Sequence, residues 1–597
     1  MNLQRTRHAF VSYRAITLRT SIHPTMGRLP LKFGSARNAQ VLASIPEKHL
    51  DEYDVVVVGS GAAGMTAALA AKKRGLSVVV VEKSEYFGGS TARSGGGVWI
   101  PNNSVILSAG VPDSPEQAAT YLSQVVGPDV PIERQQAFLE QGPKMLDFVM
   151  DNSPLRFRYM KHYSDYYPDL PGGLDIGRSL EPVQVDGNLL GTEKHRLNPP
   201  YIPFPTIVMY SNDYKWLNLA CVNMKGIATG VKCAMGALKA AIRGQKPLTM
   251  GEGLAAGLRL GLMDAQVPVI HNSPLVDLVQ DGDAVSGVII EQNGVRSTIR
   301  ARKGVVIGSG GFEHNAEMRN EYQQQPINTQ WTVGSEGNTG DGIRAGAKVG
   351  AALSLMDDSW WGPTIPVPGK PFFCLSERSL PGGLFVNKHG KRFVNESGPY
   401  CEVVHIMYEQ DRSDDGSEIP TWMVVDQNYR NRYVFKDVPG RFPISKFWYE
   451  SGVVKKAKTL QELAQQIKVP EDALQATVAR FNGHAKSGVD EDFGRGNNMY
   501  DRYFSDPAVK PNPCLAPLEK GPFYAFKMAP GDLGTKGGIV TDVKARALRA
   551  DGTVIKGLWA AGNASSAVMG RSYAGAGATL GPAMTFGYIA ANDIANS

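Results

Sequence analysis

Short, uninterrupted runs of β-branched residues mark the first part of this 597-residue chain. Four valines follow Asp54 and four more precede Glu82, and neither run alternates with polar residues. Such runs are typical of strands that are buried on both faces, as in a parallel sheet covered by helices. The alanine-rich stretch from Met65 to Arg74 predicts a helix that ends at Gly75. The pattern therefore predicts a strand, a helix and a parallel strand.

The same kind of pattern returns much later in the chain. Further apolar runs predict strands at 267–270, 275–279, 285–291 and 299–307. Another predicted strand ends at Asn563, and an alanine-rich helix then runs to Ile594. From Trp360 to about Gly534 the chain is instead rich in aromatic residues and proline.

These patterns predict an α/β fold in which a discontinuous Rossmann-like domain is interrupted by an α+β substrate and catalytic domain. The first domain would comprise both the part of the chain before the aromatic section and the part after it. The predicted boundaries are 1–50 for an extension outside the fold, 51–358 and 535–597 for the Rossmann-like domain, and 359–534 for the inserted domain.

The turn between the first predicted strand and helix has the composition of a phosphate-binding loop. It carries glycines at Gly59, Gly61 and Gly64, which allow a tight turn and a close approach of backbone to a pyrophosphate. The N-terminus of the following helix favours anions. Glu82, at the end of the second strand, can accept hydrogen bonds from a ribose. These features together predict a dinucleotide site.

A second glycine and hydroxyl cluster runs from Tyr86 to Gly97, directly after the acidic strand. A cofactor with a ribityl chain and a second phosphate needs such a polar nest, and a nicotinamide cofactor does not. The alternative is a flexible surface loop, but Trp99 and Ile100 follow at once and favour a built site. We therefore predict FAD. Because the cluster contains no histidine to tether the flavin, we expect non-covalent binding.

The predicted cofactor-binding residues come from five parts of the chain. They are Gly59, Ser60, Gly61, Ala62, Ala63, Gly64, Glu82, Lys83, Gly88, Gly89, Ser90, Ser94, Gly95, Gly96, Gly97, Val276, Gly311, Asp341, Gly562, Asn563 and Leu580.

Composition excludes several classes of protein. The chain is 42% hydrophobic and 20% charged, as is ordinary for a globular protein. Its net charge of +6 is scattered, without the interleaving of basic and aromatic residues that would predict a nucleic-acid partner. The five cysteines lack C-x-x-C spacing, so we predict neither a disulfide framework nor a metal site, and we expect a reducing compartment. No apolar run has the length of a membrane span.

Two basic segments leave alternatives open. Residues 1–46 contain several arginines and no acidic residue, which is typical of an organelle transit peptide. We favour instead an over-long gene model that truly starts at Met26 or later, and a bacterial cytoplasmic protein. The stretch from Trp216 to Arg243 is apolar and studded with lysines. We favour a surface helix there, with a peripheral membrane contact as the alternative.

Four motifs carry a resemblance to a known family. They are Ser164-Asp-Tyr-Tyr167, Asn395-Glu-Ser-Gly-Pro-Tyr400, Asp532-Leu-Gly-Thr-Lys-Gly-Gly538 and Tyr573-x-Gly575-x-Gly577. With them, the chain from about Tyr53 to its end resembles the 3-ketosteroid Δ1-dehydrogenases, within the wider fumarate reductase-like flavoprotein group. A fumarate reductase would present histidine and arginine clamps for a dicarboxylate. Here tyrosines and other aromatic residues stand in their place, which fits a neutral, apolar ketone.

The resemblance implies an activity and a set of catalytic residues. The family removes a proton from C2 of a 3-ketosteroid and passes a hydride from C1 to FAD. By motif, Tyr400 would be the base, with Tyr166 hydrogen-bonded behind it. The Tyr573 hydroxyl and the Gly577 amide would bind the C3 carbonyl oxygen, where two donors stabilise the developing enolate. We also expect Tyr166 to lower the pKa of Tyr400 by donating to the phenolate.

One departure and two alternatives qualify this picture. The family usually has prolines where this chain has Ala574 and Ala576, so we expect a freer loop and a less certain substrate range. The first alternative is a Δ4-dehydrogenase of 5α-reduced 3-ketosteroids. The second is a redox-silent flavoprotein that only binds a sterol or a partner. The resemblance also implies an acceptor for the flavin electrons, with a quinone or an artificial dye as the candidates.

Overall fold

The computed structural model describes residues 52–201, 208–413, 419–436 and 438–597. The predicted extension of residues 1–50 lies outside the described residues.

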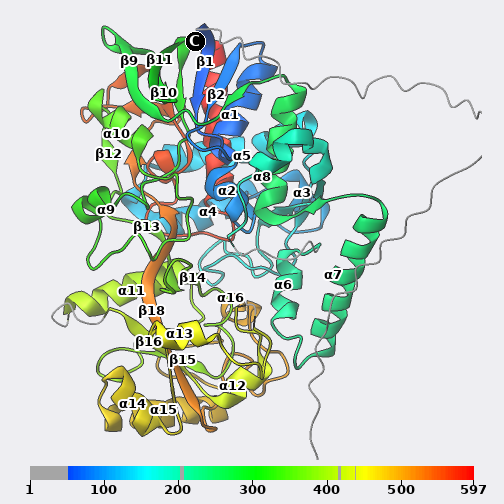
Figure 1. Cartoon of the computed structure of the whole chain (residues 1–597), viewed down its shortest axis with the longest axis vertical. Helices are drawn as coiled ribbons and strands as arrows, with labels where there is room; N and C mark the ends of the chain where they lie inside the picture. The colour runs from blue at the N-terminus through cyan, green and yellow to red at the C-terminus, as the bar shows by residue number, and fades with distance from the viewer. Residues whose placement is uncertain (1–51, 202–207, 414–418, 437) are drawn as a thin grey trace, which may run out of the picture. The chain divides into compact units, whose positions relative to one another are not determined.

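An eight-stranded sheet forms the upper part of the molecule in Figure 1. Its centre is β1 (Glu52–Val58), which pairs in parallel with β2 (Val78–Val81) and β11 (Val295–Ile307). Two further strands extend these pairs in parallel, namely β8 (Val269–Ile270) beside β2 and β21 (Val554–Ala560) beside β11. The strands predicted at the two ends of the chain therefore lie in one sheet.

The valine runs of β1 and β2 face two separate hydrophobic cores. Val55 and Val57 pack in one core with α1 (Ala62–Lys73) and α17 (Leu580–Asn596). The alternate valines, Val56 and Val58, pack in a second core. That core includes the antiparallel strands β9 (Leu275–Asp281) and β10 (Ala284–Gln292). The sheet is thus covered on both faces, as the uninterrupted valine runs predict.

A second, antiparallel sheet of six strands forms the lower part of the molecule in Figure 1. Helices α14 (Leu460–Ile467) and α15 (Glu471–Ser487) contribute to a hydrophobic core with it. Its strands are β13 (Ser359–Ile365), β14 (Phe372–Phe373), β15 (Gly383–Val386), β16 (Thr421–Val425), β17 (Val454–Ala457) and β18 (Phe523–Thr535).

The long strands of this second sheet begin and end where the inserted domain is predicted. The described residues nevertheless form one compact unit. The division into a Rossmann-like domain and an insert therefore stays a prediction.

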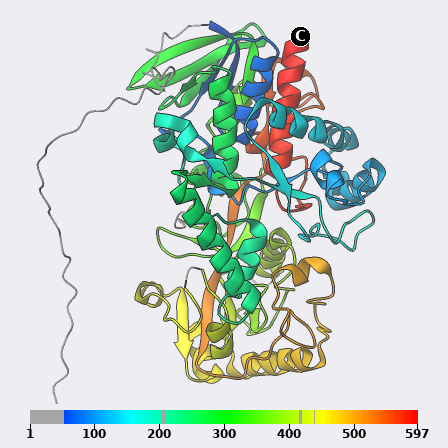
Figure 2. The ribbon, with the colours of Figure 1, turned by 90° about the vertical axis from the view of Figure 1, so that its right-hand side faces the viewer.

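Several helices surround the junction between the two sheets. Helices α4 (Pro115–Val126) and α5 (Ile132–Asn152) lie along the chain between the glycine clusters and the motif at 164–167. Helix α6 (Ser211–Leu217) packs against α7 (Met224–Ile242), which stands at the edge of the molecule in Figure 1 and crosses its front in Figure 2. Among helices in the described ranges, none is both long and apolar enough to cross a bilayer.

The remaining elements are short or connect these layers. The helices are α2 (Gly89–Arg93), α3 (Ser104–Ser108), α8 (Met250–Asp264), α9 (Ala316–Tyr322), α10 (Asp341–Lys348), α11 (Tyr400–Ser413), α12 (Gln427–Arg432), α13 (Lys446–Glu450) and α16 (Met499–Tyr503). Single turns of 3₁₀ type occur at Gly127–Asp129 and Gly562–Ala564, and a longer one at Gly187–Arg196. The strands are β3 (Val98–Trp99), β4 (Phe157–Tyr159), β5 (Ser179–Pro182), β6 (Val185–Asp186), β7 (Pro247–Leu248), β12 (Leu353–Ser354), β19 (Gly538–Ile539) and β20 (Arg546–Leu548).

Candidate active site and cofactor cradle

One continuous cavity joins the glycine loops to the tyrosines of the sequence motifs. Its glycine-lined part fits a bound FAD, because several glycines face open space. A Cβ at Gly89 or Gly95 would meet no atom within 4 Å, and one at Gly61 would come only within 3.8 Å of the Thr91 hydroxyl. Side chains at these positions would therefore project into the space that a cofactor needs.

The turn after β1 depends on glycine for a different reason. Gly59 has φ +99°, and an added Cβ would lie 2.5 Å from the Gly308 carbonyl oxygen. The turn therefore brings two strand ends, after β1 and after β11, into contact beside the cavity. Helix α1 begins directly after this turn, and its first residues line the cavity. A pyrophosphate there would lie at a helix N-terminus.

Glu82 also holds the phosphate-binding loop in place. Its Oε2 accepts hydrogen bonds from the Ser60 amide at 2.9 Å and from the Ser60 hydroxyl at 2.5 Å. Its Oε1 accepts one from the Ser84 amide at 2.9 Å. Burial raises the pKa of the Glu82 carboxyl, and these hydrogen bonds oppose that rise. Glu82 therefore fixes the loop as well as offering an acceptor to a ribose.

Lys83 and Asp341 close the cavity at the start of α10. The Lys83 ammonium lies 2.7 Å from Asp341 Oδ2 and 2.5 Å from the Thr339 hydroxyl. Both residues of the ion pair line the cavity. They come from separate segments of the chain, which the fold brings to the carboxyl ends of β2 and β11.

Most of the predicted cofactor-binding residues line the cavity, and four do not. Gly64 packs against Gly59, where an added Cβ would lie 2.0 Å from the carbonyl oxygen. Gly88 packs against Ala92 and Ala255. The remaining two, which also lie off the lining, are Val276 and Gly311.

For Val276 and Gly311, binding to the cofactor stays a prediction, and the structure shows only where the residues face. Neighbouring side chains on a strand point to opposite faces, and on β9 it is Leu275 that reaches the cavity while Val276 is 36% exposed. Gly311 faces the Thr535 and Glu313 side chains. Conversely, pattern reasoning missed lining residues such as Tyr201, Tyr214 and Phe373, which lie in loops and short elements without periodicity.

The four predicted catalytic residues, Tyr166, Tyr400, Tyr573 and Gly577, line the same cavity. The Tyr166 hydroxyl donates to the Tyr400 hydroxyl at 3.1 Å. The Tyr573 ring stacks on Tyr166 with centroids 5.2 Å apart, and its edge contact with Tyr400 has a centroid distance of 5.4 Å. The Thr579 hydroxyl donates to the Tyr573 hydroxyl at 3.0 Å. Burial raises the pKa of Tyr573, and Thr579, Tyr400 and the Gly577 amide oppose that rise. Three segments thus meet at one point.

Hydrogen bonds hold the loop that carries Tyr573 and Gly577. The Ala574 carbonyl accepts from the Tyr121 hydroxyl at 2.6 Å and from the Tyr166 amide at 3.1 Å. Gly577 has φ +97°, and an added Cβ would lie 2.3 Å from the Gly97 carbonyl group. These contacts hold the loop at both ends, and the expectation that it is freer than a loop with the family's prolines stays a prediction.

Buried ion pairs position the other two tyrosines. Tyr400 is the first residue of α11, and the preceding Glu396 is bound by Arg392 at 2.8 Å and Arg495 at 3.0 Å. The loop of Tyr166 is fixed by Asp165, which forms a fully buried ion pair with Arg178 and accepts a hydrogen bond from the Trp99 indole at 2.9 Å. Charges therefore lie behind the tyrosines and orient them.

The tyrosines themselves lie in an apolar setting. Burial raises the pKa of Tyr400 well above its ordinary value, and the neighbouring Tyr573 and Cys401 raise it further. Burial also raises the pKa of Tyr166. The expected lowering of the Tyr400 pKa by Tyr166 is thus outweighed in this structure. The hydrogen bond from Tyr166 stabilises a phenolate, but burial disfavours the charge more strongly.

A chain of ionised groups packs directly behind this apolar cluster. Asp358 contacts the Lys536 ammonium at 3.1 Å and His405 Nε2 at 3.0 Å, and His405 Nδ1 lies 3.7 Å from Glu402. Despite burial, the two cations lower the pKa of Asp358 to about 2. The two carboxylates overcome the effect of burial on His405 and raise its pKa to about 9. The chain joins α11 to β18 and the start of β13.

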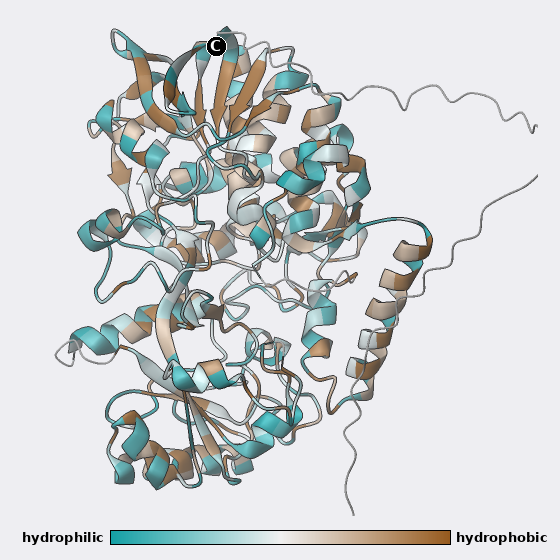
Figure 3. Cartoon of the chain, in the orientation of Figure 1, coloured by the Kyte–Doolittle hydropathy of each residue, from teal (hydrophilic) through white to brown (hydrophobic). Residues whose placement is uncertain are grey.

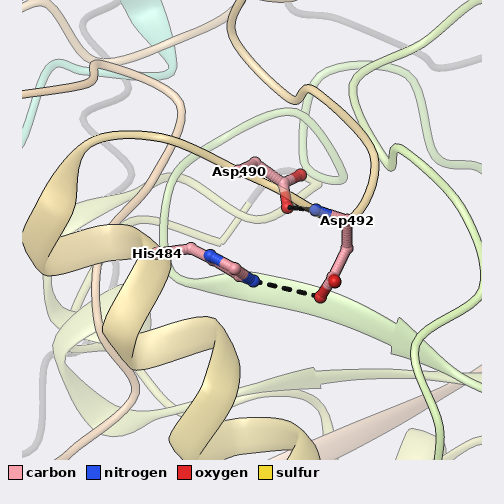
Figure 4. Close-up of side chains that lie close together, drawn as sticks. All are labelled: His484, Asp490 and Asp492. Atoms are coloured by element: carbon pink, nitrogen blue, oxygen red, sulfur yellow. Dashed lines mark hydrogen bonds and ion pairs between the residues drawn. The ribbon is translucent and has the colours of Figure 1, made fainter.

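A second polar cluster lies outside the cavity, at His484, Asp490 and Asp492 (Figure 4). His484 Nε2 lies 3.1 Å from Asp492 Oδ2. Both Asp490 oxygens accept from Arg392 at 2.8 Å, and Asp492 accepts from Arg480 at 2.6 Å. Arginines already compensate both carboxylates, so the arrangement is accounted for as an ion-pair cluster that secures the loop after α15.

Comparison with known proteins agrees with this geometry. The FAD binding domain family model matches residues 54–580. The 3-oxosteroid 1-dehydrogenase of Mycolicibacterium smegmatis is 53% identical, over 91% of this chain and 97% of that protein. The 4-oxocyclohexanecarboxylate 2-dehydrogenase of Sinomonas cyclohexanicum is 37% identical, over 91% of this chain and 93% of that protein.

A solved structure matches over nearly the whole described chain. The 3-ketosteroid Δ1-dehydrogenase of Sterolibacterium denitrificans, in complex with 1,4-androstadiene-3,17-dione, has a TM-score of 0.87 and 41% sequence identity. The match covers 92% of this chain and 100% of that one. FAD is thus the cofactor of this protein, which is an oxidoreductase. The chain belongs to the FAD-binding domain family and, within it, to the 3-oxosteroid 1-dehydrogenases.

Proposed function

We propose that the protein desaturates the C1–C2 bond of 3-ketosteroids and that Tyr400, Tyr166, Tyr573 and Gly577 carry out this reaction. The observation that carries the proposal is the convergence of these residues in a cavity shared with the flavin cradle. The relatives named as 3-oxosteroid 1-dehydrogenases, and the steroid in the complex of the solved structure, support the substrate class.

The chemistry follows from where the donors and the acceptor lie. The Tyr573 hydroxyl and the Gly577 amide bind the C3 carbonyl oxygen and stabilise negative charge as the C2 proton leaves. The Tyr400 phenolate accepts that proton and becomes a neutral phenol, and before the transfer Tyr166 stabilises the phenolate through the 3.1 Å hydrogen bond. FAD, when bound, supplies the acceptor for the hydride that leaves C1. The apolar surroundings exclude water from the enolate.

Burial of Tyr400 determines its protonation state before the reaction. Because the pKa of Tyr400 is raised, the phenol is neutral at neutral pH before substrate binds. Only the phenolate can accept the C2 proton, so Tyr400 must first release its own proton to solvent, and the fraction of enzyme in that form grows as the pH approaches the raised pKa. The rate should therefore rise with pH over an alkaline range.

The test uses two substrates and one acceptor. Purified holoenzyme is incubated with androst-4-ene-3,17-dione, or with 5α-androstane-3,17-dione, and an artificial electron acceptor. We expect a 1,2-desaturated product from both. A 4,5-desaturated product from the 5α-reduced steroid would replace the proposal with the Δ4 activity. Steroid binding without dye reduction would leave only the redox-silent alternative.

The flavin must pass its electrons to an acceptor, and helix α7 bears on where the enzyme meets that acceptor. We propose a quinone as the acceptor of the flavin electrons and a peripheral contact with a membrane surface, where both quinones and sterols dissolve. The basic, apolar helix α7 supports the membrane contact. Comparing the rates of dye reduction and quinone reduction tests the acceptor. Repeating both measurements with added vesicles tests the membrane contact.

A further inference from the structure

Helix α7 (Met224–Ile242) exposes a continuous apolar stripe. The stripe, coloured brown along the helix in Figure 3, has residues 48% to 78% exposed. This is unlike the ordinary surface helix, whose apolar residues face the core. The residues of the stripe are Met224, Ile227, Val231, Met235, Leu238 and Ile242.

The opposite side of α7 faces the protein with small residues. Gly226, Thr229, Cys233 and Ala240 are buried. With 3.6 residues per turn, these positions lie roughly opposite the exposed stripe. The burial of the helix is thus inverted, since its small residues face inward and its large apolar residues face outward. Helix propensity does not require that inversion, so an apolar environment outside the protein is its natural explanation.

A row of cations flanks the stripe. Lys225, Lys232 and Lys239 recur every seven residues, and Arg243 and Lys246 follow them. All five side chains are exposed. From Tyr214 to Gly251 the sequence contains no Asp or Glu. Lys232 forms an ion pair with Asp213 of α6 at 2.8 Å, so the positive charge beside the apolar line comes from the other four cations. An apolar line with positive charge beside it is the pattern of a helix that lies in the plane of an anionic membrane surface.

A second copy of the chain is a poorer occupant for the same stripe. A helix pair along this seam would place the lysine rows beside alanines or beside each other, without a carboxylate partner on α7. Anionic headgroups supply the missing negative charge, and acyl chains take up the stripe. Charge complementarity thus favours lipid.

The ends of the α6–α7 segment connect this surface to the active-site cavity. Met209, Ser211 and Tyr214 line the cavity before α7, and Lys246 to Met250 line it after α7. The chain therefore leaves the cavity wall, forms the exposed helix and returns to the wall. A helix of 19 residues is about 28 Å long, so the excursion is a substantial lipid-facing surface.

We propose that α7 docks the enzyme on anionic phospholipid bilayers and that the cavity takes its apolar substrate from the bilayer. This inference rests on the proposed steroid dehydrogenase function for the nature of the substrate. The docking itself depends only on α7.

The first experiment measures docking without steroid. Full-length holoenzyme is sedimented with vesicles of phosphatidylcholine alone and of phosphatidylcholine mixed with phosphatidylglycerol. We expect binding to the mixed vesicles that weakens as salt is added. Met235→Glu/Leu238→Glu should weaken it at least tenfold. Lys239→Glu/Arg243→Glu should weaken it by roughly 25-fold or more, at about fivefold per cation.

Matched controls change similar residues elsewhere. Val295→Glu replaces an exposed apolar residue on the β10–β11 hairpin, and Lys73→Glu/Lys144→Glu reverses two exposed cations on α1 and α5. Both controls should bind as the wild type does. Failure of the wild type to bind mixed vesicles would overturn the proposal. A dimer that Met235→Glu/Leu238→Glu dissociates in analytical ultracentrifugation would overturn it in favour of self-association.

The second experiment separates docking from catalysis. Dehydrogenation is measured with steroid supplied on cyclodextrin and with steroid dissolved in mixed vesicles. Met235→Glu/Leu238→Glu should match the wild type with cyclodextrin and be several-fold slower with vesicles. Equal rates from vesicles would overturn delivery from the bilayer. Vesicle binding without turnover of either form would instead contradict the proposed function and leave docking intact.

Discussion

The glycine half of the cavity is made mainly of backbone, whereas the tyrosine half is made of side chains from three distant segments. In the cradle, tight turns such as Gly59 and the start of α1 supply the shape. In the catalytic half, Tyr166, Tyr400 and Tyr573 are each oriented by separate contacts behind them. The glycine half should therefore tolerate changes of single side chains better than the tyrosine half. The substitutions below test this contrast.

The largest effect is expected from the hydroxyl of Tyr400. Tyr400→Phe keeps the ring and its packing, so FAD binding should persist. Turnover should fall by about 10²–10⁴-fold, as for the loss of a general base. Tyr166→Phe should cost less and shift the pH–rate profile to higher pH, since Tyr166 acts through Tyr400. Loss of flavin from Tyr400→Phe would show that the tyrosine half also contributes to FAD binding, against the expected separation of the two halves.

A slightly smaller effect is expected at the carbonyl-binding donor. Tyr573→Phe should lower the single-turnover rate of flavin reduction by about 10²–10³-fold, the cost of one oxyanion donor. Steroid binding should weaken much less, because the donor acts mainly on the developing enolate. The 3-hydroxy analogue, which has no carbonyl to polarise, should not reduce the flavin. Equal reduction by the alcohol would remove the carbonyl clamp from the mechanism.

The charged chain behind the tyrosines should give the protein a pH-dependent stability. The pKa of His405 is raised to about 9, above the ordinary value of about 6.5. Its contribution to the free energy of unfolding is therefore complete below about pH 6.5 and is lost as the pH rises through 9, roughly 3 kcal/mol in all. Denaturant unfolding between pH 6 and 9.5 should show a flatter dependence for His405→Gln. His195→Gln, at an exposed histidine, should follow the wild type.

The smallest effect is expected in the cradle. Glu82→Ala removes the carboxylate that holds Ser60, so the dissociation constant of FAD should rise by the equivalent of about 1.5–3 kcal/mol. Turnover with saturating FAD should remain near that of the wild type. Glu85→Ala, at the exposed neighbouring acid, is the control and should change neither quantity. A loss of turnover larger than that of Tyr573→Phe would reverse the ranking of the two halves.

The same contrast explains what could be predicted from the sequence. The first part of the cradle lies within residues 59–97, so the turn at Gly59 and the acid at Glu82 are visible in the local pattern. The tyrosines were found through motifs rather than periodicity, since no local pattern brings Tyr166 beside Tyr400. The pairing of Asp358 with His405 and Lys536 has no local signal at all, because only the tertiary fold brings these residues together.

Helix α7 illustrates a different limit. Its lysines and apolar residues are plain in the sequence, and a surface helix is a fair interpretation of them. The packing of the helix against the rest of the protein decides which of its sides is buried. In this structure the buried side carries Gly226 and Ala240. The amphipathic pattern alone therefore gives the helix but not the direction of its apolar side.

The packing of α1 against α17 sets the order in which this protein can mature on the ribosome. Residues 62–73 carry the phosphate-binding end of the cradle, and their partner helix is residues 580–596. At about 5–20 residues per second, the ribosome needs roughly 25–100 s between the two helices. During that time the nascent chain lacks both the second wall of its cofactor cradle and Tyr573. Flavin loading therefore belongs to the end of synthesis, and a premature stop codon near the C-terminus should produce an apoprotein.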